Sequence, residues 1–134
     1  ALRRVPEPML AAFNVAGWTY RIDFDYISEL SKQLNMSCIG ATNYSQKTIY
    51  LSEASATLHE FGHFLDWMLG FPAEYEQLFR AEWVKVTAKV AREYFADCFA
   101  YWVKYAENAN AISLLQECAP MTYRYMEDLM RIAN

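Results

Sequence analysis

Both histidines of this chain, His59 and His63, fall in one pentapeptide with the sequence HEFGH. Apolar residues recur at helical spacing on both sides of it, which predicts a helix that begins at Ser52 and is stopped by Gly70 and Pro72. Residues four apart share one face of a helix, so the two imidazole rings point the same way. Because the rest of this helix is apolar, the rings would be buried at a cost unless the fold supplies polar partners.

Two imidazoles at this spacing can converge on one tetrahedral Zn²⁺ ion, at about 2.0–2.1 Å from each ring nitrogen. Glu60 lies about 100° around the helix from His59, where its carboxylate can hold a water molecule on the metal rather than bind the metal itself. The pattern therefore predicts one zinc ion per chain, bound by His59 and His63, with Glu60 as the general base. The alternative is a pair of surface histidines beside an unrelated glutamate.

A catalytic zinc ion needs a third protein ligand and one open position, and Glu93 is the strongest candidate for that ligand. It lies on a second predicted helix, residues 88–106, which is apolar over most of its circumference. A carboxylate in such surroundings is costly unless a cation compensates it. Asp97, one turn later on the same face, is expected to accept a hydrogen bond from the far ring nitrogen of one histidine. The alternative is that Glu93 and Asp97 form a solvated stripe.

Other acidic residues fit the ligand role less well. Asp66 lies seven residues beyond His59, about 10.5 Å along the helix, so its short side chain cannot reach a metal between the two histidines. We expect Asp66 to support a ligand or to pair with a cation that steadies the helix. The longer motif HExxHxxGxxH is excluded, since Leu69 occupies its third ligand position. The remaining candidates are weaker and are expected at the surface: Glu74, Glu76 and Glu82.

The periodicity of the chain changes at Ser52. Before it, the pattern predicts a helix over 8–15, a strand over 18–23, a helix capped by Asp25 and running to Asn35, and strands over 38–43 and 48–51 joined by a polar turn. After it, only helices are predicted: 73–86, 88–106, 108–118 and 120–132. The expected fold class is α+β: a small N-terminal mixed α/β part with a short sheet, then a helical C-terminal half that carries the HExxH helix and the glutamate helix.

Composition bounds what the chain can be. Its 134 residues, 54% of them hydrophobic, suit a single domain over 1–134 with a real core. A net charge of −4 gives no basic surface for nucleic acid, and no run of 18 apolar residues predicts a membrane span. Three cysteines without CxxC spacing predict neither a disulfide framework nor a thiolate metal site, and Cys98 is expected to be a small buried apolar residue. Nothing in the composition indicates an oligomeric state.

Two segments, LHEFGHFLD at 58–66 and EYFADCFA at 93–100, resemble the gluzincin metallopeptidases. The likeness is strongest to the catalytic C-terminal domain of anthrax lethal factor and its small bacterial relatives. The resemblance implies a zincin-like metallopeptidase domain in which His59, His63 and Glu93 bind zinc, Glu60 is the general base and Asp97 orients a histidine. The match is looser at 48–51 and 120–123. The spacing from the second histidine to the glutamate also resembles, less closely, small intracellular zinc peptidases that cut transcriptional regulators.

One position departs from the lethal factor pattern. The family usually has a tyrosine seven residues before the glutamate ligand, where it acts on the substrate carbonyl, and Val86 stands at that position here. Tyr123 and Tyr125 are available as substitutes, but packing is the expected role of each, so this role stays unassigned. The departure favours one alternative: a catalytically impaired zinc-binding interaction module or toxin component. A bundle without any metal is a third possibility.

The expected activity is a zinc-dependent endopeptidase acting on a peptide or protein substrate. The strand over 38–43 or the strand over 48–51 could present an edge to which a peptide adds as a further strand. Phe64, Trp67, Met68 and Phe71 could line an apolar pocket, although core packing is the expected role of each. The basic residues Arg80, Lys85, Lys89 and Arg92 are expected to form a solvated face. We expect a leader before Ala1 to have been removed, and a secreted or extracellular location, with the cytoplasm as the alternative.

Overall fold

The computed structural model describes residues 2–72, 82 and 91–133. Helices dominate, and one small sheet lies in the first half of the chain, so the predicted α+β class is confirmed. In chain order the elements are η1 (Leu2–Arg4), α1 (Glu7–Val15), β1 (Thr19–Ile22), α2 (Phe24–Leu34), β2 (Gly40–Asn43), β3 (Thr48–Leu51), η2 (Ala54–Ala56), α3 (Thr57–Met68), α5 (Ala91–Tyr105), α6 (Ala109–Cys118) and α7 (Pro120–Ala133).

The sheet has three strands in the order β1-β3-β2. β1 pairs with β3 in parallel, with Thr19 opposite Thr48, and β2 pairs with β3 antiparallel, with Gly40 opposite Leu51. The central position of β3 matches its burial, because Ile49 and the two residues after it are all buried. Of the two strands expected to present a free edge for a peptide, only β2 lies at an edge of the sheet, and no other described strand pairs with its outer side. The prediction of a free edge on 48–51 is wrong, because both sides of β3 are paired.

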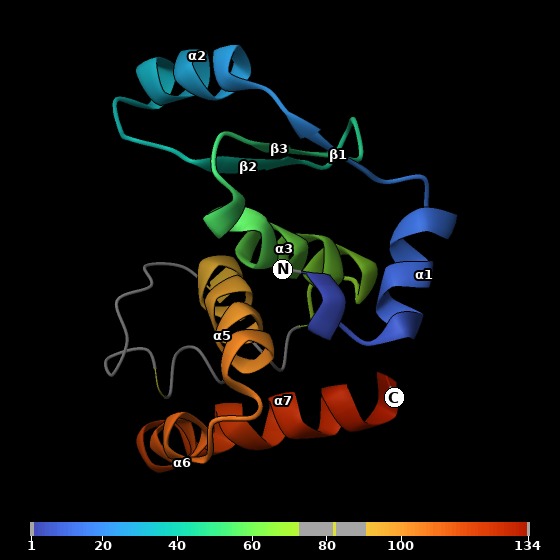
Figure 1. The fold of residues 1–134 in the computed structure, drawn as a ribbon, viewed down its shortest axis with the longest axis vertical. Coiled ribbons are helices and arrows are strands. Elements are labelled where there is room, and N and C mark those ends of the chain that lie inside the picture. The colour runs from blue at the N-terminus through green and yellow to red at the C-terminus, as the bar shows by residue number, and fades with distance from the viewer. Residues whose placement is uncertain (1, 73–81, 83–90, 134) are drawn as a thin grey trace.

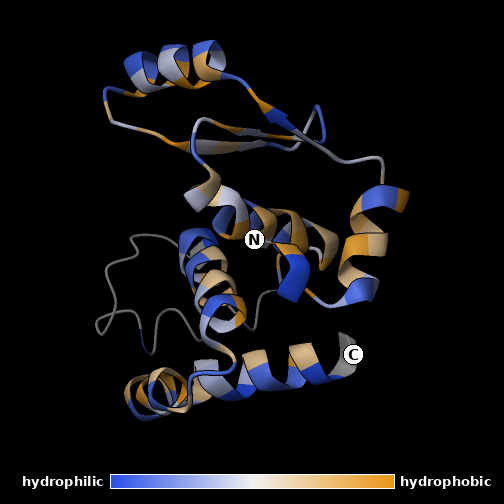
Figure 2. Ribbon diagram, in the orientation of Figure 1, coloured by the Kyte–Doolittle hydropathy of each residue, from blue (hydrophilic) through white to orange (hydrophobic). Residues whose placement is uncertain are grey.

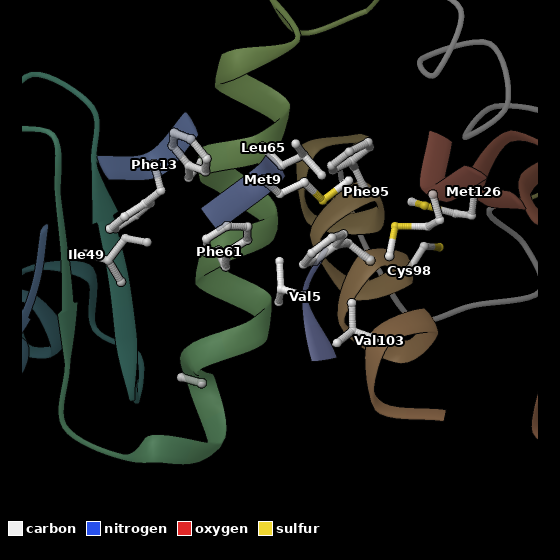
Figure 3. Packing of buried hydrophobic residues seen from close by; sticks show 14 of the residues in the cluster. Val5, Met9, Phe13, Ile49, Phe61, Leu65, Phe95, Cys98, Val103 and Met126 are labelled. Atoms are coloured by element: carbon white, nitrogen blue, oxygen red, sulfur yellow. The ribbon is translucent and has the colours of Figure 1, made fainter. Parts of the chain in front are cut away.

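Helix α3, which carries the HEFGH motif, lies between the sheet and α5, while α6 and α7 pack at the far end of the molecule (Figure 1). Aromatic side chains pack α3 against both α1 and α5. Phe61 and Phe64 pack against Phe13 of α1, and Phe61 stacks on Phe99 of α5 with ring centroids 5.7 Å apart. Figure 3 shows this cluster spanning from Ile49 through Phe61 to Val103. The predicted central position of the glutamate helix is confirmed, since most of its apolar residues are buried.

Two predicted helix starts are wrong for local reasons. Asp23, not Asp25, caps α2, because the Asp23 Oδ1 atom accepts a hydrogen bond from the Tyr26 amide at 2.9 Å. Ser52 does not cap α3. Its amide donates to the Ile39 carbonyl at 2.9 Å, so Ser52 still extends the pairing of β2 with β3, and η2 separates it from the helix. Of the predicted helix over 73–86 only Glu82 is among the described residues, and residues 88–90 lie outside them.

Three further expectations concern membrane spans, the cysteines and the remaining helix boundaries. Among the described helices, none has the length and apolar character needed to cross a bilayer. The three cysteines, all of them described, form no disulfide; Cys98 is buried as predicted, Cys38 is half-buried and Cys118 is exposed. The remaining helix boundaries, α1, α6 and α7, fall within two residues of those predicted.

Candidate metal centre

Helices α3 and α5 bring His59, His63 and Glu93 to one point. The Glu93 Oε2 atom lies 3.0 Å from His59 Nε2, and the Glu93 Oε1 atom lies 3.0 Å from His63 Nε2. Ligands of a tetrahedral zinc ion at about 2.0–2.1 Å are roughly 3.3 Å apart, so small adjustments would place these nitrogen and oxygen atoms around one ion. Potential ligand atoms of His59, Glu60 and His63 also lie within 4.8 Å of one another. The group could hold a metal ion, and the ligand roles stay predictions.

Asp97 lies behind His59, as the sequence suggested. Its Oδ1 atom is 2.7 Å from His59 Nδ1, while the other ring nitrogen faces Glu93. Burial works to lower the pKa of His59, but the hydrogen bonds to Asp97 and Glu93 outweigh burial and raise that pKa to about 10. Hydrogen bonds to His59 and His63 lower the pKa of Glu93. Asp97 is thus placed where it could hold the ring with Nε2 directed towards the centre of the group, and its orienting role stays a prediction.

His63 has a partner that the sequence analysis missed. The hydroxyl of Tyr44 lies 3.4 Å from His63 Nδ1. The Tyr44 ring makes edge contacts with Trp18 and Phe71, at centroid distances of 6.1 and 5.7 Å. Burial raises the pKa of Tyr44 to about 12, so its hydroxyl stays protonated at neutral pH. Tyr44 belongs to a polar turn with no spacing relation to the HEFGH motif, so no sequence signal marked it.

Glu60 is held against the sheet rather than against α5. It is buried, and its Oε1 atom accepts a hydrogen bond of 2.8 Å from the Thr42 hydroxyl. Gly40 makes this approach possible, since a Cβ atom at Gly40 would lie 2.9 Å from Glu60 Cγ. The Glu60 Oε2 atom lies 3.9 Å from His59 Nε2. Burial raises the pKa of Glu60, which makes its carboxylate a stronger proton acceptor beside the histidines.

Asp66 and Arg92 lie beyond His63. Asp66 is buried, and burial raises its pKa to about 6, while the nearby charges of His63 and Arg92 oppose that shift. The Arg92 guanidinium lies 3.9 Å from the centroid of the Phe71 ring. Arg92 is exposed, as expected for a solvated face, yet it also lines the cavity of the centre. The supporting role of Asp66 stays a prediction, and the other three basic residues of that face lie outside the described residues.

An open cavity of about 630 Å³ contains the centre. His59, Glu60, His63 and Glu93 contribute to its wall. The four residues that could line an apolar pocket are not among its lining residues, and Phe64 and Trp67 instead take the core-packing role that is expected of them. Phe64 is buried in the core, Trp67 packs on Trp18 and Met68 is exposed. The Phe71 ring contacts the Tyr44 ring and the Arg92 guanidinium. The apolar wall comes instead from α2 and the segment before β2.

Several other candidate residues lie away from the centre. Glu82, expected at the surface, is buried, and its carboxylate accepts hydrogen bonds from the Met121 and Thr122 amides at 3.1 and 2.8 Å. It therefore caps α7, where the free amides of a helix N-terminus favour an anion. The Tyr123 hydroxyl donates to Glu127, 2.8 Å away. Tyr125 packs on the core, and three further positions lie outside the described residues: Glu74, Glu76 and Val86.

Comparison with known proteins adds one finding. The family described as anthrax toxin lethal factor, N- and C-terminal domain, matches residues 24–129, which include every residue of the centre. No curated protein and no solved structure matches the chain. The match covers well over half of the sequence, so the chain belongs to the anthrax toxin lethal factor family.

Proposed function

We propose that the chain is a zinc-dependent endopeptidase. The observation that carries this proposal is the meeting of two imidazole Nε2 atoms with one carboxylate, each contact 3.0 Å long, beside a buried glutamate with one oxygen turned towards them. A purely structural zinc ion normally takes four protein ligands and has no use for such a base. Family membership supports the proposal, because the match over residues 24–129 contains the HEFGH segment. That segment resembles the catalytic domain of lethal factor.

In this proposal His59, His63 and Glu93 hold the zinc ion. When bound, zinc lowers the pKa of a coordinated water towards 7 and polarises the substrate carbonyl. Glu60 takes the proton of the attacking water on Oε2, because Oε1 is engaged by the Thr42 hydroxyl. The same carboxyl group then returns the proton to the leaving amine. Asp97 and Tyr44 fix the orientation of the two imidazole rings from behind.

A peptide is the substrate class that the neighbouring strand favours. Ile39 lies opposite Ser52 and accepts its amide hydrogen, so this is a hydrogen-bonded pair of the antiparallel ladder. Hydrogen-bonded and non-hydrogen-bonded pairs alternate along such a ladder. The amide and carbonyl groups of Ala41 therefore point towards β3, and those of Gly40 and Thr42 point away from it. These free groups lie on the strand that packs on α3, so an extended peptide paired with them would pass the metal centre.

The alternative is a catalytically impaired zinc-binding module or toxin component. It is favoured by Val86, which replaces the family's tyrosine, and the family description covers two domains rather than a catalytic one alone. The presence of Glu60, held by Thr42 in a position suited to a base, counts against it.

The test compares the wild-type chain with Glu60→Gln, which keeps the side chain's shape and its hydrogen bond from Thr42 while removing the base. Both proteins are loaded with zinc, their metal content is measured, and both are incubated with a mixed peptide library analysed by mass spectrometry. The proposal expects one zinc ion per chain in both and cleavage by the wild type alone. Zinc binding without cleavage by either protein would support the module, and absence of bound zinc would overturn both.

A further inference from the structure

An apolar surface adjoins the metal centre. Leu34, the last residue of α2, and Met36 and Ile39, in the connection to β2, expose 53%, 60% and 40% of their area. With the half-buried Leu30 they form what we term the apolar shelf. Figure 2 shows hydrophobic colour on the connection that leads from α2 into β2. Single exposed apolar residues are common on proteins, but four gathered in one place indicate a contact surface.

The apolar shelf is continuous with the candidate catalytic groups. All four of its residues line the same cavity of about 630 Å³ as His59, Glu60, His63 and Glu93. The four side chains are uncharged, whereas Glu60, Glu93 and Arg92 supply carboxyl and guanidinium groups to the cavity wall. The cavity therefore has a polar part at the metal and an apolar part under α2.

The apolar shelf also lies beside the backbone groups that a peptide would use. Ile39 directly precedes Gly40, whose outward amide and carbonyl begin the free edge of β2. Side chains of an extended peptide alternate between two faces, with about 6.6–6.8 Å between residues on the same face. A peptide that pairs with Gly40 and Thr42 next to the metal would thus direct one side chain, close to the scissile bond, onto the apolar shelf.

We infer that the apolar shelf is a specificity pocket that receives a large apolar side chain, such as leucine, methionine or phenylalanine, of the peptide bound along β2. The inference rests on the proposed peptidase function and adds to it the residue type that the enzyme selects. Filling an apolar pocket discriminates between side chains by roughly 10- to 200-fold in kcat/KM. Because this pocket is open to solvent, we expect a value of about 10.

The experiment starts from a peptide that the zinc-loaded wild type cleaves in the library. Fluorogenic versions are made in which each position near the scissile bond is in turn leucine or serine. We expect one position at which leucine raises kcat/KM by about tenfold over serine. The double variant Leu34→Ser/Met36→Ser should reduce this ratio to below about threefold. The matched control is Leu114→Ser/Met121→Ser, whose residues expose 56% and 52% of their area outside the cavity, and it should keep the ratio.

A binding measurement separates this inference from the proposed activity. The leucine and serine peptides, or library peptides of both kinds if nothing is cleaved, are titrated against zinc-loaded Glu60→Gln with and without the Leu34→Ser/Met36→Ser changes. If the leucine peptide binds more tightly than the serine peptide and the Leu34→Ser/Met36→Ser changes abolish this difference, the pocket is supported. This holds even if the wild type cleaves nothing, because the lack of cleavage would overturn only the proposed peptidase activity. Cleavage with a preference that the shelf variant retains, or that the control variant loses equally, overturns the pocket and leaves the peptidase standing.

Discussion

Gly62 of α3 lies directly against Ala96 of α5. A Cβ atom built on Gly62 would lie 2.8 Å from Ala96 Cα, which is closer than carbon atoms tolerate, and 3.1 Å from the Ala96 carbonyl oxygen. The two backbones can approach so closely only because position 62 has no side chain. Gly62 precedes His63, and Ala96 precedes Asp97, so this contact sets the separation across which the histidines and acids of the centre meet.

Replacement of Gly62 by alanine should therefore destabilise the protein and disturb the centre. Alanine is favoured over glycine within a helix by about 1 kcal/mol, so helix preference alone would raise stability. A measured loss of stability must therefore come from the clash with Ala96. Overpacking usually costs about 1–3 kcal/mol, and the helix preference of alanine offsets about 1 kcal/mol of that. We therefore expect a net loss of up to about 2 kcal/mol in urea unfolding, with weaker zinc binding. Ala96→Gly in the same chain should not restore stability, since the nearest atoms belong to the Ala96 backbone. A gain in stability of about 1 kcal/mol, the full helix preference of alanine, would show that the helices can separate without cost.

Zinc affinity should respond in graded fashion to the two acids of α5. Asp97→Asn leaves the three proposed ligands in place but weakens the hydrogen bond that orients His59, for which a 10- to 100-fold loss is expected. Glu93→Gln removes a charged ligand and should cost more. Competition with a chromophoric chelator measures both affinities. Asp128→Asn serves as the control, because Asp128 is an exposed acid paired with Arg131 on α7. If Glu93→Gln bound zinc as tightly as the control, Glu93 would not be a ligand.

Tyr44 should matter to zinc binding through His63. Tyr44→Phe keeps the ring contacts with Trp18 and Phe71 and removes only the hydroxyl near His63 Nδ1. We expect a zinc affinity about tenfold lower, at the small end of the range for such partners because the contact is 3.4 Å long. The melting temperature of the metal-free protein should change little, which separates this role from packing. The control is Tyr101→Phe, whose hydroxyl bonds the Ala111 carbonyl far from the centre. Equal zinc affinity of both variants would exclude the role.

The residues of the centre were predictable to different degrees, for physical reasons. His59, Glu60 and His63 follow from spacing on one helix, and Glu93 with Asp97 from charge on an apolar helix. Tyr44 and Thr42 reach the centre from the sheet, and their approach depends on tertiary packing that no local pattern records. Glu82 was misplaced at the surface because its partners, the free amides of α7, lie about 40 residues away in sequence. The start of α3 was missed because strand pairing at Ser52 prevailed over its capping preference.

Zinc binding should release a proton from His59. In the metal-free protein the partners Asp97 and Glu93 raise the His59 pKa to about 10, so the ring is charged at pH 7, whereas a ligand imidazole must be neutral. Calorimetry of zinc binding in buffers of different ionisation enthalpy should thus report about one proton released at pH 7. The apparent zinc affinity should rise by about tenfold per pH unit from neutral pH towards 10.

The same hydrogen bonds predict how the stability of the metal-free protein depends on pH. A folded-state pKa raised above the unfolded value of about 6.5 means that charged His59 stabilises the fold fully below pH 6.5. This contribution is lost as the pH rises through about 10. The melting temperature of the wild type measured in EDTA should fall over that interval. Asp97→Asn removes one of the two partners that raise the His59 pKa, so its melting temperature should fall less. Zinc binding to this variant should also release fewer protons. A melting temperature that did not change between pH 7 and 10 would mean that His59 is neutral before the metal binds.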